Sequence, residues 1–333
     1  MTTVPGLDVR VEHVPWDDPE VAALRVAQQA ELRERYGDDD IGHAMTGEQV
    51  VVMVLLRLDG EPVACGALRD ASDELGPGTG ELKRMYVRPV TRGRGLSRVV
   101  LSELEQVATA RGTTRLVLET GVLQPEAIGL YLGAGYRPVE NYGEYVGVGD
   151  SRCFAKDLLA SPAPPRPARA PSGDVTVARV DWDAREAVAL RWAMVDELVP
   201  LYPEMSLGDP GGRERTDARL GAGALATFVA HLDGAPVAHA ALVDAAAWGA
   251  GTGELKRLYV APAARGHGVA RRLVGYVEQA AAGLGLSRVV LDTGIRQPEA
   301  IALYRSLGYR PVRPGGDWSA LPLSLFLGRD LTP

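Results

Sequence analysis

The chain has 333 residues, of which 46% are hydrophobic and 24% are charged, a composition that excludes a disordered, collagenous or disulfide-scaffolded protein. Its length predicts about two domains, and its formal net charge of −7 argues against a general nucleic-acid binder. The longest apolar run, residues 50–56, is far too short for a membrane span of about 20 residues.

The N-terminal segment and the cysteines indicate the compartment. The segment carries several acidic side chains and lacks the basic and apolar regions of a secretion signal. Cys65 and Cys153 form neither a CxxC pair nor a metal-ligand pattern, and the five histidines show no such pattern either. We therefore expect a reduced, cytoplasmic protein without a metal or a membrane partner. The 33 arginines against 3 lysines are typical of a GC-rich genome, such as that of an actinobacterium.

Hydrophobic periodicity predicts alternating strands and helices in the first half of the chain. Asp59-Gly60, between two β-rich runs, predicts a tight hairpin. Gln124 is placed to cap a late helix, with Pro125 at its first position. The predicted elements, in chain order, are a strand at 8–14, a helix with apolar Val21, Leu24, Ala27 and Leu32, strands at 50–58 and 62–68, a strand containing 81–87, a helix after the turn 92–97, a strand at 116–120, the late helix and two final strands.

The second half of the chain repeats the first. Three segments recur 173 residues later: Glu81–Val87 as Glu254–Val260, Gln124–Ile128 as Gln297–Ile301, and Gly135–Val139 as Gly308–Val312. Upstream the offset is 166, since Trp16 matches Trp182, so the second copy has gained a few residues before its central strands. We predict two domains of one fold, at 1–159 and 174–333. The repeated elements include a strand at 175–180, a helix with apolar Val188, Trp192, Val195 and Leu198, an Asp233-Gly234 hairpin and a strand at 289–293.

Residues 160–173 separate the two copies. Their proline and alanine favour an extended polyproline II spacer, and a disordered tether without a role of its own explains the same composition. Residues 1–160 hold 17 basic and 25 acidic side chains, whereas residues 174–333 hold 17 and 18. The acidity therefore belongs to the first copy.

A glycine-rich turn follows the strand 81–87 and its repeat. The two turns read Arg92-Gly-Arg-Gly-Leu-Ser97 and Arg265-Gly-His-Gly-Val-Ala270. Glycines permit a tight turn that leaves N–H groups free at the start of a helix, and such a helix end binds phosphate. Both turns lack the third glycine of the dinucleotide GxGxxG pattern and the lysine of the P-loop.

The combination of motifs is more specific than the turn. A strand ending in Tyr-Val-x-Pro, then Arg-x-x-Gly-x-(Gly/Ala), then a helix with Leu-Tyr-x-x-x-Gly-Tyr resembles the GNAT superfamily of acyltransferases over nearly all of both copies. The resemblance implies an α/β fold class with two tandem GNAT folds. Each would be a mixed, mostly antiparallel sheet with a splayed parallel strand pair and flanking helices. Acetyl-CoA, the acyl donor, would lie between the splayed strands with its pyrophosphate on the glycine turn.

The resemblance also implies roles for the residues that match the family's motifs. Tyr131 and Tyr304 would protonate the departing CoA thiolate, with packing aromatics as the alternative. Glu81 and Glu254 would be general bases, and substrate positioning or an ion pair within the sheet is the alternative. The implied acetyl-CoA contacts are Met85, Tyr86, Val87, Arg92, Gly93, Arg94, Gly95, Leu96, Ser97 and Gln124 in the first copy, and Leu258, Tyr259, Val260, Arg265, Gly266, His267, Gly268, Val269, Ala270 and Gln297 in the second.

Several positions distinguish the two copies from each other or from the family. Ser97 stands where the family has Gly or Ala, and Gln124 and Gln297 stand where many relatives have Asn. We expect both copies to bind CoA and, if only one is catalytic, favour the second. His267 either touches phosphate or faces solvent. Acidic residues near the expected acceptor pocket would attract a cationic amine, or form a solvated loop: Asp38, Asp39, Asp40, Glu204 and Asp209.

The expected function is acetyl transfer from acetyl-CoA to a primary amine of a small metabolite by direct attack on the thioester. An amine at pH 7 is mostly protonated, so a base must take its proton, and a tyrosine can protonate the leaving thiolate. The alternative is that one or both copies are non-catalytic acyl-CoA-binding or structural modules. Acetylation of a protein or peptide, and an activity like that of mycothiol synthase, a two-domain member of the superfamily, are lesser alternatives. A monomer and a homodimer fit the sequence equally.

Overall fold

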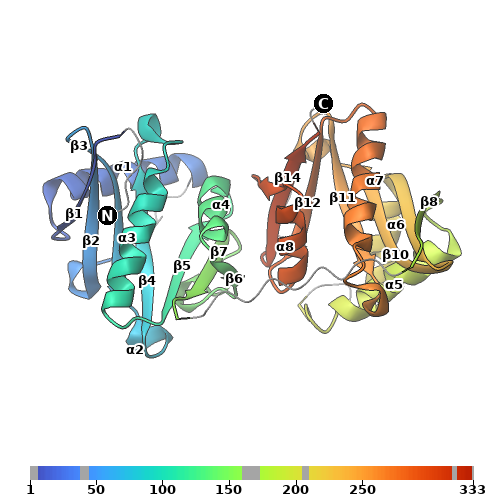
Figure 1. Cartoon of the computed structure of the whole chain (residues 1–333), viewed down its shortest axis with the longest axis horizontal. Helices are drawn as coiled ribbons and strands as arrows, with labels where there is room; N and C mark the ends of the chain where they lie inside the picture. Colours follow the sequence, from blue (N-terminus) through green and yellow to red (C-terminus); the bar gives the residue numbers. More distant parts are fainter. Residues whose placement is uncertain (1–6, 38–44, 160–172, 205–209, 317–320, 332–333) are drawn as a thin grey trace. The chain divides into compact units, whose positions relative to one another are not determined.

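The computed structural model describes residues 7–37, 45–159, 173–204, 210–316 and 321–331. The chain divides into two compact units, the first of residues 1–163 with 319–323 and the second of residues 164–318 with 324–333. Within the described residues each unit contains one seven-stranded sheet flanked by helices (Figure 1). No helix in this described part of the chain has the length and apolar character that crossing a bilayer requires.

The first unit has the strand order β1-β2-β3-β4-β5-β7-β6. All neighbouring strands are antiparallel except β4 and β5, which run parallel. Its elements are β1 (Val9–Val14), α1 (Pro19–Tyr36), η1 (Gly47–Gln49), β2 (Val50–Leu58), β3 (Glu61–Asp70), α2 (Ser72–Leu75), β4 (Thr79–Val87), η2 (Pro89–Thr91), α3 (Leu96–Ala110), β5 (Arg115–Gly121), α4 (Pro125–Gly133), β6 (Arg137–Val139), η3 (Gly143–Tyr145) and β7 (Ser151–Asp157).

The second unit repeats this topology as β8-β9-β10-β11-β12-β14-β13, again with one parallel pair, β11 and β12. Its elements are β8 (Val175–Val180), α5 (Arg185–Leu198), α6 (Gly212–Ala222), β9 (Ala224–Leu232), β10 (Ala235–Asp244), η5 (Ala246–Trp248), β11 (Thr252–Val260), η6 (Pro262–Ala264), α7 (Val269–Gly283), β12 (Arg288–Gly294), α8 (Pro298–Ser306), β13 (Arg310–Pro311) and β14 (Ser324–Asp330). The mixed, mostly antiparallel sheet predicted for both copies is confirmed.

Local sequence explains the joints between these elements. The hairpin between β2 and β3 turns at Asp59 and Gly60, with φ of +53° and +86°, the left-handed pair that a two-residue turn requires. Asp18 accepts hydrogen bonds from the amides of Glu20 and Val21 and so caps α1. α1 ends at Gly37, whose φ of +69° is easily adopted only by glycine.

Helices cover both faces of the first sheet. Leu24 of α1 belongs to the buried cluster that contains Cys65 of β3. α3 lies on the other side, where a Cβ on Gly66 would meet Val100 at 2.7 Å and Leu104 at 2.9 Å. Because neighbouring strand residues point to opposite faces, Cys65 and Gly66 place α1 and α3 on opposite sides of β3. Gly66 is required here by the close approach of α3.

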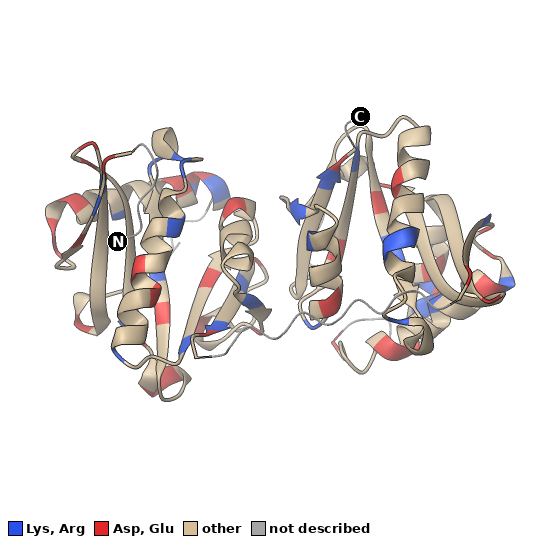
Figure 2. Cartoon of the chain, viewed as in Figure 1, with Lys and Arg blue, Asp and Glu red and all other residues tan. Residues whose placement is uncertain are grey.

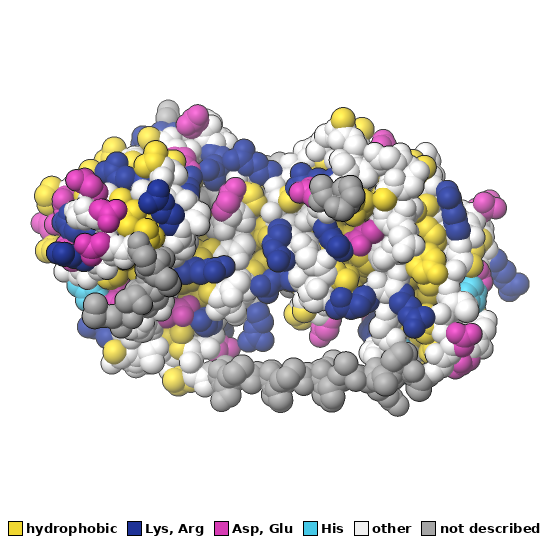
Figure 3. Space-filling model, turned by 45° about the horizontal axis from the view of Figure 1, so that its top comes forward, with side chains coloured by type: hydrophobic (Ala, Val, Ile, Leu, Met, Phe, Trp, Pro, Cys, Tyr) yellow, Lys and Arg dark blue, Asp and Glu magenta, His cyan; other side chains and the backbone are white. Residues whose placement is uncertain are grey.

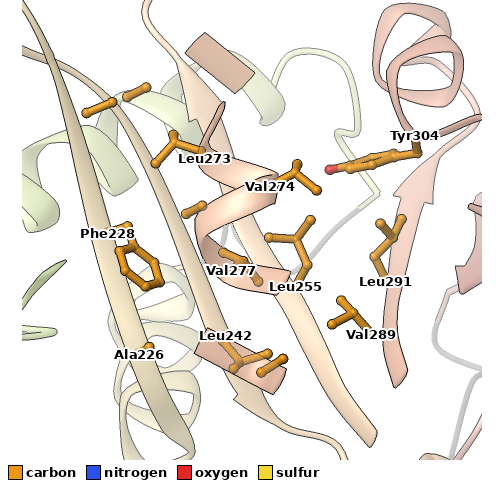
Figure 4. Close-up of a cluster of buried hydrophobic side chains, with 14 of the residues drawn as sticks. Ala226, Phe228, Leu242, Leu255, Leu273, Val274, Val277, Val289, Leu291 and Tyr304 are labelled. Atoms are coloured by element: carbon orange, nitrogen blue, oxygen red, sulfur yellow. The ribbon is translucent and has the colours of Figure 1, made fainter. Parts of the chain in front are cut away.

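The second sheet is covered in the same way. Figure 4 shows Leu273, Val274 and Val277 of α7 packed on the sheet beside Phe228, and all four residues belong to the larger buried cluster of this unit. Val229, the next residue along β9, belongs instead to a cluster with α5 on the opposite face. Burial of such apolar side chains, at about 25 cal/mol per Å2, is the main stabilisation of each unit.

The predicted helix with apolar Val188, Trp192, Val195 and Leu198 is confirmed as α5. Of these four residues only Val195 is fully buried. The residues that α5 buries are Ala187, Leu190, Arg191 and Val195. Arg191 is buried because Asp217 of α6 neutralises it at 2.6 Å, and apolar periodicity cannot detect a charged residue in a buried face. α6 lies between α5 and β9 and accounts for the residues gained by the second copy.

The late helices begin where they were predicted to begin, but without the expected side-chain cap. Gln124 and Gln297 are the N-cap residues of α4 and α8, and each is followed by proline. Neither glutamine side chain hydrogen-bonds the helix amides. The Gln124 side chain instead hydrogen-bonds the hydroxyl of Tyr36.

Charged side chains are distributed over both units (Figure 2). On the face drawn in Figure 3, basic and acidic side chains are interspersed rather than gathered by sign. Long-range attraction of a polyanion depends on a surface of one sign. The chemistry of the molecule must therefore be sought in local sites.

Candidate active site

The parallel strands of each sheet separate half-way along their length. β4 pairs with β5 only from Thr79 to Leu82, and β11 pairs with β12 only from Thr252 to Glu254. Beyond these residues the backbone of β4 and of β11 has no parallel neighbour. The predicted splayed pair is therefore confirmed, and its free edges are Met85–Val87 and Leu258–Val260.

A backbone bulge lies at the point of separation. Arg84 and Arg257 have φ of +56° and +57°, a left-handed conformation that costs a non-glycine residue about 1 kcal/mol or more. The register between β4 and β3, and between β11 and β10, shifts at the same place. The same strained residue in both units indicates that the bulge is what splays the strands.

Each glycine turn leads into an uncapped helix. Gly93 and Gly95 have φ of +79° and +81°, Gly266 and Gly268 have φ of +82° and +75°, and no side chain caps α3 or α7. The first amides of these helices therefore lack an intrahelical acceptor and point out of the helix end. A Cβ at any of the four glycines would meet no atom within 4 Å. Open space before free amides at the positive end of a helix dipole fits a phosphate group.

The arginine that begins each turn holds the turn to its surroundings. Arg92 pairs with Glu31 of α1 at 2.6 Å, and its Nε donates to the carbonyl of Val87 at 2.9 Å. Arg265 does the same with Glu197 of α5 and the carbonyl of Val260. Their charges are thus largely neutralised by glutamate, and their contacts are those of residues that position the turn. Arg94, Leu96, Ser97, Val269 and Ala270 lie in the same two turns, with Leu96 and Val269 buried and Arg94 exposed.

The side chain of His267 is half-buried in the second turn. Its Nδ1 is shielded from solvent and has no hydrogen-bond partner among the described residues. The sequence left open whether His267 touches phosphate or faces solvent, and a half-buried ring does not face solvent fully.

Tyr131 and Tyr304 occupy equivalent buried positions on α4 and α8. Their rings pack against Tyr136 and Tyr309, with centroids 5.8 Å apart in both units. Figure 4 shows Tyr304 reaching from its helix toward Val274 of α7. Burial raises the pKa of both phenols, so each hydroxyl keeps its proton at neutral pH. No described residue hydrogen-bonds either hydroxyl, so both protons are available for donation.

A cavity of about 860 Å3 opens from the strand separation of the first unit. It is lined by α1, β3, β4, the end of β5, α4 and residues 142–151. Glu81, Glu119, Gln124 and Tyr131 all line it. The cavity therefore joins the free edge of β4 to a set of titratable side chains, as an acyl-transfer site requires.

Glu81 is held at the floor of this cavity by three side chains. Its carboxylate has no exposed surface, and Arg69 Nε donates to its Oε2 at 2.5 Å. Tyr142 donates to Oε1 at 2.9 Å, and Lys83 Nζ lies 3.2 Å from the same oxygen. Arg69 is itself bound in bidentate fashion by Glu74. The carboxylate thus lies in an ion-pair network, which is the pairing within the sheet that the sequence left open as an alternative.

Glu254, the counterpart of Glu81, has fewer partners. Lys256 Nζ lies 2.9 Å from its Oε1 and also pairs with Asp292 of β12. Burial raises the pKa of Glu254, and the Lys256 ammonium opposes the rise. For Asp292 burial again raises the pKa, but the nearby Lys256 ammonium outweighs it, so its pKa lies below the usual range. In the second unit, therefore, Glu254 is the more basic carboxylate, and Asp292 is held in its ionised form by Lys256.

Glu119 of β5 is a half-buried acid that sequence reasoning missed. Ser151 Oγ donates to its Oε1 at 2.7 Å, and burial raises its pKa to about 7. Its signal in the sequence was an acidic residue inside an otherwise apolar strand, matched by Asp292 in the repeat. Lys83 and Lys256 were missed too, although both lie inside the most closely repeated segment.

Protonation of Glu119 predicts a pH-dependent stability. The pKa falls from about 7 in the folded chain to 4.5 in the unfolded chain, so the stabilisation is complete below pH 4.5 and is lost as the pH rises through 7. At about 1.4 kcal/mol per pH unit, the loss is roughly 3 kcal/mol. Urea unfolding of the wild type and of Glu119→Gln between pH 4.5 and 8 measures it. As the pH rises, the free energy of unfolding of the wild type should fall by that amount relative to that of Glu119→Gln. A difference in unfolding free energy between the two that does not change with pH would contradict the raised pKa of Glu119.

Tyr36 and Tyr202 close the far end of the strand separation. Their hydroxyls accept from the amides of Leu123 and Arg296 at 3.1 and 3.0 Å. A Cβ on Gly121 would lie 1.8 Å from the Tyr36 hydroxyl, so this glycine is required by close approach. Tyr36 thus fixes the end of α1 to the segment after β5, and Tyr202 fixes the segment after α5 to the one after β12.

The remaining predicted site residues fall into two groups. Asp38, Asp39, Asp40 and Asp209 lie outside the described residues. Glu204 pairs with Arg296 at 2.8 Å. In the described ranges no three His, Cys, Asp or Glu side chains gather as a metal site would need.

Comparison with known proteins matches the chain to one family. The family model "Acetyltransferase (GNAT) family" matches residues 12–136 and 191–309. An IAA acetyltransferase of Azospirillum brasilense is 44% identical over 81 residues, which cover 24% of this chain and 53% of the relative. An uncharacterized N-acetyltransferase of Schizosaccharomyces pombe is 32% identical over 108 residues, which cover 32% of this chain and 64% of the relative. The chain thus spans between half and two thirds of the length of these curated relatives.

Solved structures resemble single units of the chain. A candidate acyl-CoA N-acyltransferase from Klebsiella pneumoniae is 30% identical, with 46% of this chain covering 99% of that one at a TM-score of 0.40. A GNAT family acetyltransferase from Elizabethkingia anophelis, solved with acetyl-CoA bound, is 15% identical, with 45% of this chain covering 98% of that one at a TM-score of 0.33.

Proposed function

The chain belongs to the acetyltransferase (GNAT) family, and from that premise we propose that both units bind acetyl-CoA and transfer its acetyl group to a primary amine of a small molecule. The observation that carries the proposal is the strand separation that meets an uncapped, glycine-bounded helix end, present in both units. The acceptor class is drawn from the acidic lining of the first cavity. We further propose that residues 160–173 link domains at 1–159 and 174–333, and that the protein acts in the cytoplasm.

The free edges of β4 and β11 would hold the pantetheine arm. Met85–Val87 and Leu258–Val260 have no parallel strand partner, so this edge can bond an extended amide chain as a neighbouring strand would. The carbonyls of Met85, Val87 and Val260 already accept one side-chain hydrogen bond each, from Gln28, Arg92 and Arg265. The glycine turns would hold the pyrophosphate. In the same split, a backbone N–H can stabilise the negative charge that develops on the thioester oxygen during attack.

Transfer requires two proton movements. The amine nitrogen attacks the thioester carbon, and a carboxylate takes the proton that nitrogen loses. The C–S bond then breaks, and Tyr131 or Tyr304 gives its phenolic proton to the thiolate. Both phenols are protonated at neutral pH, as a proton donor must be, and burial, which raises their pKa, also makes them weaker acids than an exposed tyrosine.

Loss of both phenolic hydroxyls should abolish turnover. With acetyl-CoA and a panel of amines, the Tyr131→Phe, Tyr304→Phe double variant should release free thiol at least about 100-fold more slowly than the wild type. Each single variant should lose only the part of the thiol-release rate that its own unit contributes. Tyr276→Phe on α7, where the side chain is 41% exposed, is the matched control and should be unaffected.

Two outcomes of this experiment would count against the proposal. If the double variant keeps more than a tenth of the wild-type rate, the tyrosines are packing residues. If the wild type binds CoA yet releases no thiol with any amine or peptide, the units are acyl-CoA-binding modules. That second function is favoured for the first unit alone by one observation, the complete enclosure of Glu81 in ion pairs.

A further inference from the structure

The two units differ at the partners of their equivalent glutamates. Glu81 pairs in register with Arg69 across β3 and β4, whereas Glu254 pairs in register with Val243 across β10 and β11. Tyr142 donates a hydrogen bond to Glu81, and the equivalent position in the second unit, 173 residues later, is Gly315. Among the described residues, two of the three side chains that hold Glu81 thus have no counterpart beside Glu254, and only the lysine is retained, as Lys256.

Close packing around Gly315 leaves no room for a side chain such as that of Tyr142. A Cβ there would lie 2.6 Å from the Cα of Trp248 and 2.8 Å from the carbonyl of Ala247. Trp248 packs against Phe326, with ring centroids 5.9 Å apart. The Trp248 ring, from the β10–β11 connection, thus adjoins the position equivalent to Tyr142, and none of the tyrosines that the structure describes donates to Glu254.

The acids on the neighbouring parallel strands, Glu119 on β5 and Asp292 on β12, differ in the opposite sense: here the second unit's acid has more partners. In the second unit Asp292 is engaged at both oxygens, by Lys256 at Oδ1 and by Ser324 Oγ at Oδ2, 3.4 Å away. In the first unit Glu119 accepts from Ser151 at one oxygen, and its other oxygen has no hydrogen-bond partner among the residues that the structure describes. Lys83 does not reach it, because its ammonium lies with Glu81, Glu144 and Tyr145.

We propose that the two units use different general bases, Glu119 on β5 in the first unit and Glu254 on β11 in the second. The inference rests on the proposed acetyl transfer. Each of these carboxylates borders the strand separation and has one oxygen without a hydrogen bond from a described residue. The other acid of each unit is engaged at both oxygens, Glu81 by Arg69, Lys83 and Tyr142, and Asp292 by Lys256 and Ser324. The amine proton passes to that oxygen as the C–N bond forms, and the tyrosine of the same unit protonates the thiolate as the C–S bond breaks.

The electrostatic surroundings agree with this exchange of roles. Burial raises the pKa of Glu119 to about 7 and raises that of Glu254, so both are stronger bases than an exposed carboxylate. The charged and titratable groups around Glu119 are Glu81 and Lys83 of β4, Tyr36 of α1, Tyr131 of α4, Asp150 before β7, Tyr145 of η3 and Cys153 of β7. Those around Glu254 are Lys256 of β11, Asp292 of β12 and Arg219 of α6.

The test uses full-length chains in which one unit is silenced. Gly268→Glu removes acetyl-CoA binding from the second unit and Gly95→Glu from the first, and thiol release is followed against pH with the best amine of the panel. In the Gly268→Glu chain, we expect Glu119→Gln to lower kcat/KM about 100-fold and to remove its rise with pH near 7. Glu81→Gln should keep that rise, whatever its effect on stability. In the Gly95→Glu chain, Glu254→Gln should remove the rise with pH and Asp292→Asn should keep it.

The controls separate a lost base from a lost fold. Glu61→Gln, at an exposed hairpin position, should leave both profiles unchanged, and urea unfolding of every variant reports whether its units remain folded. The proposal is overturned if Glu119→Gln keeps the pH rise, if Glu81→Gln removes it while the chain stays folded, or if only the Gly95→Glu chain turns over. Absence of thiol release from the wild type would instead overturn the proposed function, and this inference with it.

Discussion

A glutamate at Gly268 will weaken acetyl-CoA binding at the second unit at least 100-fold, about 3 kcal/mol, and a glutamate at Gly95 will do the same at the first. Both glycines end the turn directly before an uncapped helix, and a new side chain there enters open space rather than the core. The carboxylate would occupy the position of the pyrophosphate and repel it. Equilibrium dialysis with labelled acetyl-CoA measures the number of sites and their dissociation constants.

Backbone strain must be separated from charge in this experiment. The φ of +75° at Gly268 is costly for any residue with a Cβ, by about 1 kcal/mol. Gly268→Asn and Gly95→Asn are the matched controls, because asparagine adopts this conformation and carries no charge. They should weaken binding far less than glutamate. Equal losses for asparagine and glutamate would mean that the turn shapes the helix end without contacting phosphate.

Replacing Arg69 by valine will destabilise the first unit by about 3 kcal/mol or more. The substitution installs the residue that the second unit has at this position, and it leaves the Glu81 carboxylate, which has no exposed surface, without its closest cation. Breaking a buried pair by removing one partner is costly because the remaining charge is not solvated. Urea unfolding followed by tryptophan fluorescence and circular dichroism measures the loss.

The chain offers a control for this substitution in an exposed ion pair. Arg10 lies 3.7 Å from Asp8, and the two side chains are 70% and 61% exposed. Arg10→Val should therefore change the free energy of unfolding by less than about 1 kcal/mol. A loss for Arg69→Val no larger than that for Arg10→Val would show that Glu81 is stabilised without its arginine, and the account of the network would fail.

Most of the fold could be predicted from the sequence because the chain contains two copies, so each element is predicted from two independent stretches of sequence. The Asp59-Gly60 and Asp233-Gly234 hairpins follow from local residues whose turn leaves few conformations open, whereas the splayed parallel strand pair was implied by the resemblance to the GNAT superfamily. The buried face of α5 could not be predicted, because Arg191 is buried by a partner on α6, a helix that the first copy's sequence does not announce. The side-chain cap predicted for Gln124 and Gln297 was wrong, since a helix start fixes the backbone of its N-cap residue but not the side chain.

The candidate site was only partly accessible to sequence reasoning. The glycine turns and the tyrosines Tyr131 and Tyr304 lie inside motifs, so their neighbours along the chain identify them. The environment of Glu81 depends on Arg69 and Tyr142, which come from another strand and a distant loop and match no motif. Its difference from Glu254 is therefore a tertiary property, and the two copies diverge there although their motif residues agree.

Calorimetric titration of the unmodified chain with CoA tests the central claim most directly, because every role assigned to the two units depends on a CoA site in each. The account predicts two molecules of CoA bound per chain. A stoichiometry of one would contradict the equivalence of the two strand separations, and absence of binding would contradict the account as a whole.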